Sequence, residues 1–324
     1  MISFKKIIAA FSLLFATGFL SANTVSFETD DYKGSIIYNE KANPGQAVFA
    51  RLTMKIKKGS NNETVASIQL FKDSKKIDST KFYFLNEQGQ RKNTPDMFAT
   101  LPLSSWLSSK NEYYLRVIFS TEENTAKEVL LPFHIEDYEF PEEVLDLDEK
   151  NSQIRQNMSA ERLLQIEKLN KLLGTFNSEN IFTTAPWIKP VKSTRMTSHF
   201  ADRRTYKYTN GKSETSVHYG NDYGVPEGTD VVACADGKIV MAEFRISTGW
   251  TIVIEHLPGL YSLYYHMSAL EAKEGQFVKQ GSLIGKSGST GLATGPHLHW
   301  EVRLNMCPVQ PEIFISDYIF ENVE

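Results

Sequence analysis

Two histidines near the C-terminus, His297 and His299, are separated by the single apolar residue Leu298. In an extended segment, residues i and i+2 point to the same face, so both imidazoles emerge together while Leu298 faces the core. A glycine-rich loop at residues 288–296 leads into this segment, which is predicted to be a strand that runs to Leu304. Two imidazoles at the junction of a loop and a rigid strand can hold and use a metal ion.

A second pair, His218 and Asp222, lies four residues apart around Gly220. On a locally extended chain the two side chains share a face, and the glycine lets another backbone approach closely. With one histidine of the 297 and 299 pair, they form a set of two histidines and one aspartate, which leaves a fourth position for water. This ligand pattern is expected of a catalytic rather than a structural zinc site. Taken alone, the spacing of His218 and Asp222 more often indicates a hydrogen bond.

The elements that must position these residues lie in residues 181–324, which contain six of the seven histidines. Short apolar segments alternate there with glycine turns, which predicts an all-β domain without helices of consequence. Asp236-Gly237 predicts a tight hairpin. The predicted strands are 230–234, 237–244, 250–256, 261–266, 282–285 and 297–304.

From about residue 192 to 314 the sequence resembles the lysostaphin-type zinc endopeptidases of peptidase family M23, which cut the peptide part of bacterial peptidoglycan. The chain departs from the family pattern at Ala201, where the family has glycine, and at Asn221, a place that is normally apolar. The matching segments follow the family order: TSHFADR at 197–203, HYGND at 218–222, VPEGT at 225–229, ADGKIV at 235–240, LYYHM at 263–267, GQFVKQGSLIG at 275–285 and GSTGLATGPHLHWE at 288–301.

The resemblance implies different roles for five residues. His218, Asp222 and His299 are expected to bind one zinc ion per chain, and His266 and His297 are expected to be the catalytic histidines. Zinc lowers the pKa of a bound water and polarises the scissile carbonyl. One imidazole can then take a proton from that water while the other supports the oxyanion or protonates the leaving amine. The sequence does not assign these two tasks to individual histidines.

The implied function is hydrolysis of peptide bonds in peptidoglycan stems or cross-links. An alternative from another class is an inactive relative that binds and activates another cell-wall hydrolase, but such relatives typically lack some ligands, and all five positions are present here. A lipoyl- or biotinyl-carrier barrel is excluded because no Met-Lys-Met or Asp-Lys-Ala hairpin is present to carry the cofactor. His256 is expected to be structural or peripheral, and His199 a surface residue.

Residues 24–138 show short alternating segments separated by polar turns. Between Val48 and Ile56 the even positions are all apolar, which is the period of a half-buried strand. About seven such strands predict an antiparallel β-sandwich of immunoglobulin-like type. This accessory domain is expected either to inhibit the peptidase domain, to position it, or to bind a protein partner.

Residues 139–180 are expected to be an acidic linker followed by a helix. Acidic residues crowd around Pro141. From Ser159 to Leu173 the leucines fall on one broad helical face, with Ser159 and Gly174 as caps. We expect a connecting helix that docks on a domain surface rather than a coiled coil, because the pattern lasts barely two heptads.

Residues 1–22 predict a signal peptide, with Lys5 and Lys6 before an apolar run at 7–20 and a small-residue cleavage site that ends at Ala22. The chain is therefore expected to be exported to the periplasm or the cell exterior. The run is short for a membrane span, which needs about 20 residues, so no stable membrane insertion is expected after cleavage. A retained N-terminal anchor is the alternative.

The composition is that of an ordinary soluble protein, with 41% hydrophobic and 23% charged residues. The net charge of −4, without a basic block, gives no reason to expect nucleic acid as a partner. Two cysteines, Cys234 and Cys307, exclude a disulfide-rich scaffold and a thiolate zinc cluster. A buried thiol at Cys234 and a bridge between the two cysteines both remain open.

Overall fold

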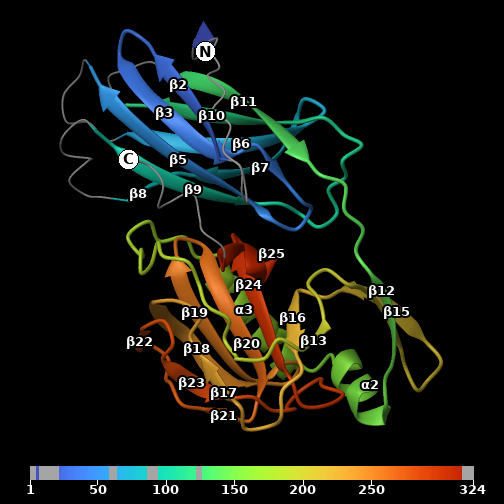
Figure 1. Ribbon diagram of the computed structural model, residues 1–324. Coiled ribbons are helices and arrows are strands. Elements are labelled where there is room, and N and C mark those ends of the chain that lie inside the picture. Colours follow the sequence, from blue (N-terminus) through green and yellow to red (C-terminus); the bar gives the residue numbers. More distant parts are fainter. Residues whose placement is uncertain (1–4, 7–21, 58–63, 86–93, 122–125, 316–324) are drawn as a thin grey trace. The chain divides into compact units, whose positions relative to one another are not determined.

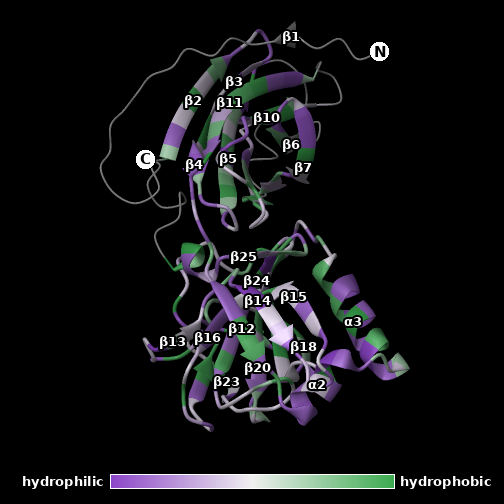
Figure 2. Cartoon of the chain, turned by 90° about the vertical axis from the view of Figure 1, so that its right-hand side faces the viewer, coloured by the Kyte–Doolittle hydropathy of each residue, from purple (hydrophilic) through white to green (hydrophobic). Residues whose placement is uncertain are grey.

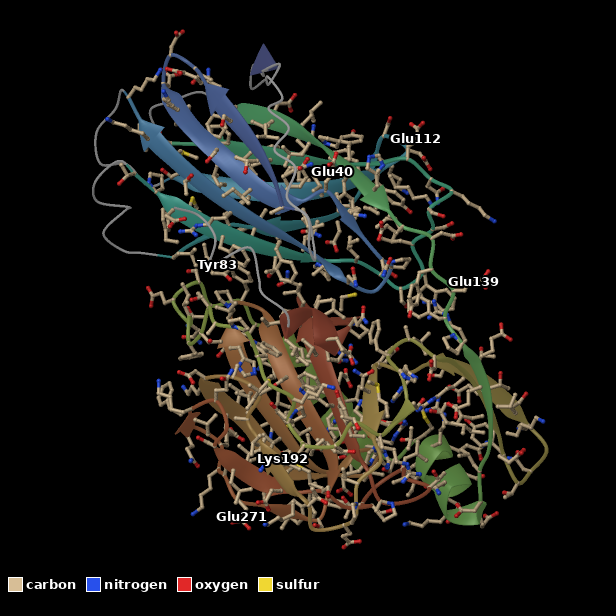
Figure 3. All side chains as sticks on the ribbon, viewed as in Figure 1. Glu40, Tyr83, Glu112, Glu139, Lys192 and Glu271 are labelled. Carbon is tan, nitrogen blue, oxygen red and sulfur yellow. The ribbon has the colours of Figure 1, made fainter. Side chains whose placement is uncertain are left out.

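A computed structural model describes residues 5–6, 22–57, 64–85, 94–121 and 126–315 (Figure 1). The chain divides into two compact units, and the second spans residues 139–318 and begins at Glu139 (Figure 3). The expected signal peptide at 1–22 lies almost wholly outside the described residues. Among those residues, no helix combines the length and the apolar character that crossing a membrane requires.

Two β-sheets with a shared core make up the first unit (Figure 1). One sheet has the order β1-β11-β10-β6-β7, with β4 beside β11, and the other has the order β2-β3-β5-β9-β8. The strands are β1 (Lys5–Lys6), β2 (Ala22–Glu28), β3 (Tyr32–Asn39), β4 (Lys41–Ala42), β5 (Ala47–Ile56), β6 (Val65–Lys72), β7 (Lys75–Lys81), β8 (Tyr83–Phe84), β9 (Asp96–Pro102), β10 (Tyr113–Ser120) and β11 (Lys127–Ile135).

Alternation along these strands builds the core of the first unit. On β10, Leu115, Val117 and Phe119 are fully buried and the residues between them are partly exposed. Strands such as β2 change between hydrophilic and hydrophobic along their length (Figure 2). Ile36 and Leu52 of the other sheet belong to the same core. The predicted mainly-β class is confirmed, and the immunoglobulin-like type stays a prediction.

Three sheets and two α-helices form the second unit. The largest sheet has the order β13-β16-β24-β20-β19-β18-β22, with β25 beside β24, and the smaller ones are β17-β23-β21 and β12-β14-β15. The elements are β12 (Glu142–Asp146), α2 (Glu149–Gln156), α3 (Ala160–Leu173), β13 (Met196–Ser198), β14 (Arg203–Lys207), β15 (Ser213–Val217), β16 (Gly220–Tyr223), β17 (Asp230–Val232), β18 (Gly237–Arg245), β19 (Gly249–Leu257), β20 (Leu260–Met267), β21 (Ala269–Leu270), β22 (Phe277–Val278), β23 (Leu283–Lys286), β24 (Leu298–Leu304), β25 (Cys307–Val309) and the 3-10 helix η1 (Pro311–Phe314).

Helix α3 covers the large sheet, and the predicted docked helix is confirmed. Leu169 and Leu173 pack on a cluster that includes Leu263 and Tyr265 of β20. The Oγ of Ser159 caps the first turn by accepting a hydrogen bond from the backbone of Arg162, and Gly174 ends the helix. The helix covers the face of β20 that carries Tyr261, Leu263 and Tyr265. The residues between them are buried on the opposite face, so the strand has a nearly continuous apolar sequence.

The acidic stretch before α3 is not a linker as expected. Residues 142–146 form β12, which pairs in parallel with β14, and α2 follows directly. The sequence does not show the alternation of a half-buried strand here, because the outward residue Val144 is apolar and the inward residue Glu143 is acidic. The buried partner of Glu143 is Arg204, at 3.2 Å, far along the chain.

The hairpin expected at Asp236-Gly237 is wrong. Strand β17 pairs with β23, and β18 pairs with β19 and β22, so no two strands pair across this turn. The Asp236 carboxylate instead accepts hydrogen bonds from the backbone of Gln280 and the ammonium of Lys279. The turn is therefore fixed by the loop before β23.

Candidate metal centre

Three neighbouring strands of the large sheet bring the predicted site residues together. Asp222 on β16 lies directly opposite His299 on β24, and β20, which carries His266, pairs with the other edge of β24. His218 and His297 come just before β16 and β24. All five residues line one cavity of about 580 Å³, a size usual for ligand sites.

His218, Asp222 and His299 direct one donor atom each to a common point. Asp222 Oδ1 lies 3.1 Å from His218 Nε2 and 2.8 Å from His299 Nδ1, and the two nitrogens are 3.0 Å apart. All three residues are buried, and these atoms form a group that could hold a metal ion. Donors bound at about 2.0–2.1 Å to a tetrahedral zinc lie roughly 3.3 Å apart, so this set fits zinc in type and spacing.

The remaining polar atoms of the three residues are anchored by neighbours. His218 Nδ1 donates to the carbonyl of His199 at 2.8 Å, and His299 Nε2 lies 3.3 Å from Glu301 Oε2. A neutral ring that donates from its anchored nitrogen presents a lone pair on the other nitrogen, which is the form that binds metal, and His299 reaches this form when it gives up its second proton. The second oxygen of Asp222 accepts from the guanidinium of Arg204 at 2.9 Å.

His266 and His297 are held in the same manner beside this group. His266 Nδ1 donates to the carbonyl of Thr290 and His297 Nδ1 to that of Gly295, both at 2.8 Å. Their ring centroids are 4.7 Å apart. His266 has a φ of 59°, a left-handed conformation that costs energy outside glycine. Both rings thus keep Nε2 available for proton transfer.

Burial and the clustered charges set the electrostatics of the site. Burial lowers the pKa of His218, and it lowers the pKa of His266 to about 3, so His266 is neutral at ordinary pH. Burial opposes the charge on Asp222, but attraction from His218 and His299 holds its pKa well below the usual range. Burial also opposes the charge on His299, but hydrogen bonds to Asp222 and Glu301 raise its pKa to about 9.

Close backbone approach at β16 depends on Gly220. A Cβ at this position would lie 2.9 Å from His299 Nε2 and 2.9 Å from the Cα of Glu301. Ala201 occupies a left-handed conformation with a φ of 66°, and its backbone N–H donates to the carbonyl of His218 at 2.7 Å. The family's glycine is therefore replaced where glycine would be unstrained. The buried Asn221 accepts from the backbone of Phe200 at 2.8 Å, so its amide is used structurally.

Four other residues considered in the sequence do not belong to the donor group. His256 is fully buried, with 2.8 Å from Nδ1 to the carbonyl of Asp236 and 2.7 Å from Nε2 to Ser262 Oγ, which is a structural role. His199 is exposed. Cys234 is a buried thiol, and no disulfide joins it to Cys307.

Residues 142–156, which comprise β12 and α2 and which we call the strap, also line the cavity. Glu143 contacts Arg204, and Asn151 donates to the carbonyl of Ala293 at 3.3 Å, in the loop before His297. Figure 1 shows α2 beside this loop. The strap is thus attached at two separate places on the cavity wall. Three residues of the site, Glu143, Arg204 and Glu301, were not expected from the sequence. Of these, Glu301 lies in a recognisable motif, the HLHWE segment.

Comparisons with known proteins agree on one family. The model of peptidase family M23 matches residues 216–311. Over 124 residues the chain is 41% identical to the DD-carboxypeptidase/endopeptidase Mpg of Neisseria meningitidis serogroup B, a match that covers 38% of this chain and 28% of that protein. Over 115 residues it is 39% identical to the peptidoglycan DD-endopeptidase ShyA of Vibrio cholerae serotype O1, covering 36% of this chain and 26% of that protein. The matches thus span little more than a quarter of either relative.

A solved structure from Pseudomonas aeruginosa, described as that of a candidate M23 peptidase, resembles a larger part of the chain. The alignment covers 85% of this chain and 95% of that chain, with 22% identity and a TM-score of 0.51. This likeness shows a common fold.

Proposed function

We propose that this chain, in which residues 216–311 match peptidase family M23, is a zinc-dependent peptidase that hydrolyses peptide bonds in peptidoglycan stems or cross-links. It acts outside the cytoplasm of a bacterium, in the periplasm or beyond. The observation that carries this proposal is the convergence of His218, Asp222 and His299 beside two further anchored histidines in one cavity.

In this proposal His218, Asp222 and His299 hold zinc, which when bound supplies a water of lowered pKa and polarises the substrate carbonyl. His266 and His297 each present an unprotonated Nε2, because Nδ1 donates to a backbone carbonyl. Such an Nε2 accepts the proton of the attacking water and returns it to the leaving amine. The carbonyls of Thr290 and Gly295 stabilise the imidazolium that forms in between.

Digestion of defined muropeptides by the full mature chain, with and without a chelator, tests the proposal. We expect new peptide termini, identified by product mass, that disappear with the chelator and return with zinc. His299→Ala removes a ligand and should lose bound zinc and activity together, whereas His199→Ala, at an exposed ring, should keep both. The alternative, an inactive protein that activates another hydrolase, predicts no cleavage by the pure chain but faster cleavage by a partner enzyme.

We further propose that the strap limits access to the cavity. Its inward residues Glu143, Leu145 and Leu147 line the cavity, and its packing is a small cluster of Leu147 with Tyr206 and Tyr208. Few buried apolar contacts make such a segment easy to open. Leu147→Ser should therefore raise the rate on polymeric peptidoglycan several-fold, and the matched exposed change Val144→Ser should not. A slower Leu147→Ser enzyme that is folded would contradict the proposal.

The first unit is proposed to inhibit the peptidase, to position it or to bind a protein partner. Cleavage of purified peptidoglycan by the mature chain and by residues 139–324 separates these roles. The fragment must begin at 139, because β12 and α3 belong to the second unit. A faster fragment supports inhibition. Equal rates exclude inhibition and leave positioning or partner binding.

A further inference from the structure

Arginines contribute to the cavity wall beside the metal centre. Arg155, Arg195 and Arg204 all line the cavity. The guanidinium of Arg155 already has partners, because it contacts Glu214 at 3.2 Å and lies 4.0 Å above the ring of Tyr206. Arg195 and Arg204 therefore remain as cations that can act on a bound molecule.

Arg204 divides its guanidinium between the metal centre and the strap. Its Nη2 donates to Asp222 Oδ2 at 2.9 Å, and its Nε donates to Glu143 Oε2 at 3.2 Å. Asp222 belongs to the core of the site, but Glu143 is brought in by β12, the outer strand of its three-stranded sheet. Opening of the strap would leave Nε of a buried guanidinium without its carboxylate, which is costly unless another anion replaces it.

Arg195 is a second cation, and it has no internal partner. Among the described parts of the chain, no hydrogen bond or ion pair is found for its guanidinium, and the side chain is exposed. Its backbone is held against the segment that follows β16. The carbonyl of Arg195 accepts from the backbone of Gly224 at 3.0 Å, and a Cβ at residue 224 would lie 3.4 Å from Arg195 Cζ. The guanidinium thus lies over the chain two residues beyond Asp222.

Glu143 reaches Arg204 in the manner expected of a peptide ligand. It stands on an extended segment whose residues alternate, so that Glu143 and Leu145 turn inward while Glu142 and Val144 are exposed. Its carboxylate also accepts from Ser198 Oγ at 3.3 Å. An extended chain with an inward carboxylate therefore already lies in the cavity beside the proposed zinc ligands.

We propose that Arg204 and Arg195 form a carboxylate subsite, which Glu143 occupies while the strap is closed and which binds a carboxylate of the substrate after the strap opens. The inference deepens and rests on the proposed function: the substrate is a peptide with a free carboxylate close to the cleaved bond. That group is either the C-terminus of a stem or a side-chain carboxylate of a stem residue. Charge-assisted hydrogen bonds of this kind give selectivity for the anion over its amide.

Matched peptides test the subsite by equilibrium binding to the zinc-loaded mature chain. All proteins in this experiment also carry His297→Ala, which slows cleavage of the peptides during the measurement. One peptide carries both carboxylates, a second has the C-terminus amidated, and a third has the side-chain carboxylate amidated. We expect one amide to bind about tenfold more weakly, which identifies the source of the carboxylate. Arg195→Gln should remove most of that difference. Arg203→Gln, an equal charge change at a residue that does not line the cavity, should preserve it.

The strap supplies a second, independent test. Glu143→Gln removes the negative charge that competes for Arg204, so the preference for the carboxylate peptide over its amide should increase several-fold, whereas Glu142→Gln should leave the preference unchanged. Equal binding of all three peptides, or a preference that survives Arg195→Gln and ignores Glu143→Gln, would overturn the subsite and make the Glu143–Arg204 pair purely structural. Cleavage by the unmutated chain is scored separately. Selective binding without any cleavage would refute the proposed function, and cleavage without selectivity would refute the subsite.

Discussion

At the scale of single residues, a hydrogen-bond partner orients each histidine ring of the site. One ring nitrogen contacts a neighbouring carbonyl or carboxylate, and the other faces the cavity. For His299 that neighbour is Glu301, a fully buried carboxylate. Burial raises the pKa of Glu301, but Arg303 and His299 outweigh burial and lower it, so the group is charged. A charged acceptor at Nε2 makes the opposite nitrogen of the ring, Nδ1, a stronger donor to a metal.

Glu301→Gln should therefore weaken zinc binding without removing a ligand. We expect the affinity to fall about 10- to 100-fold, because the amide orients His299 less strongly and leaves its basicity lower. Competition with a chromogenic chelator measures the affinity directly. Glu255→Gln, at a buried carboxylate on β19 outside the centre, is the matched control and should keep the affinity of the unmutated chain. Equal zinc affinities of the two variants would show that Glu301 does not strengthen zinc binding by His299.

His256 predicts a pH dependence of stability. Burial lowers its pKa from about 6.5 to about 4. Between these values the unfolded chain binds a proton on this ring and the folded chain does not, so stability falls as the pH drops. The loss reaches roughly 2 kcal/mol by pH 5. Urea unfolding at pH 7 and pH 5 in a chelator should show a smaller drop for His256→Gln than for the unmutated chain. His199→Gln, at an exposed ring, should show the full drop.

At the scale of elements, the segment ahead of the M23 match is part of the unit that holds the site. Helix α3 supplies core side chains to the large sheet, and β12 extends the sheet formed by β14 and β15. A boundary drawn where the family match begins, at residue 216, would remove both.

Leu173→Ala should destabilise the second unit by about 2–5 kcal/mol, because a buried leucine on α3 is replaced by a cavity. Leu164→Ala, on the same helix but 64% exposed, should change stability by less than about 0.5 kcal/mol. Denaturant unfolding monitored by fluorescence gives both values. Similar small effects of the two changes would mean that α3 is only loosely attached.

Most of what could be predicted from the sequence came from patterns within single segments. His218 and Asp222 are four residues apart, and His297 and His299 are two apart, so strand periodicity was enough to place each pair on one face. The capped helix from Ser159 was recognisable for the same reason. Their union into one centre depended on the family resemblance, since it requires β16 and β24 to be neighbours.

Contacts between distant segments were beyond the sequence. Glu143 and Arg204 are 61 residues apart, and an acidic residue beside Pro141 looks like a linker until its buried guanidinium is known. Asp236-Gly237 has the composition of a hairpin, but its carboxylate is taken by Gln280 and Lys279, which no local pattern reveals. At both places the observed structure depends on contacts with distant residues and not on the local propensity of the sequence.

At the scale of the whole molecule, two compact units with separate cores should unfold as separate transitions. Zinc binds only the folded second unit in our proposal, so it should raise that transition alone. A free zinc concentration of 100 times the dissociation constant adds about 2.7 kcal/mol, or roughly 5–10 °C for a unit of this size. Scanning calorimetry with and without a chelator measures the shift. His299→Ala should abolish it and leave the other transition in place.

The order of strands in the large sheet has a consequence for the timing of assembly. β24 lies between β16 and β20, which do not pair with one another. Asp222 and His266 therefore have no common neighbour until residues 298–304 insert between them. A polypeptide that leaves the ribosome or crosses a translocation channel N-terminus first thus has no complete donor group until β24 arrives, so under our proposal it would stay inactive during transit.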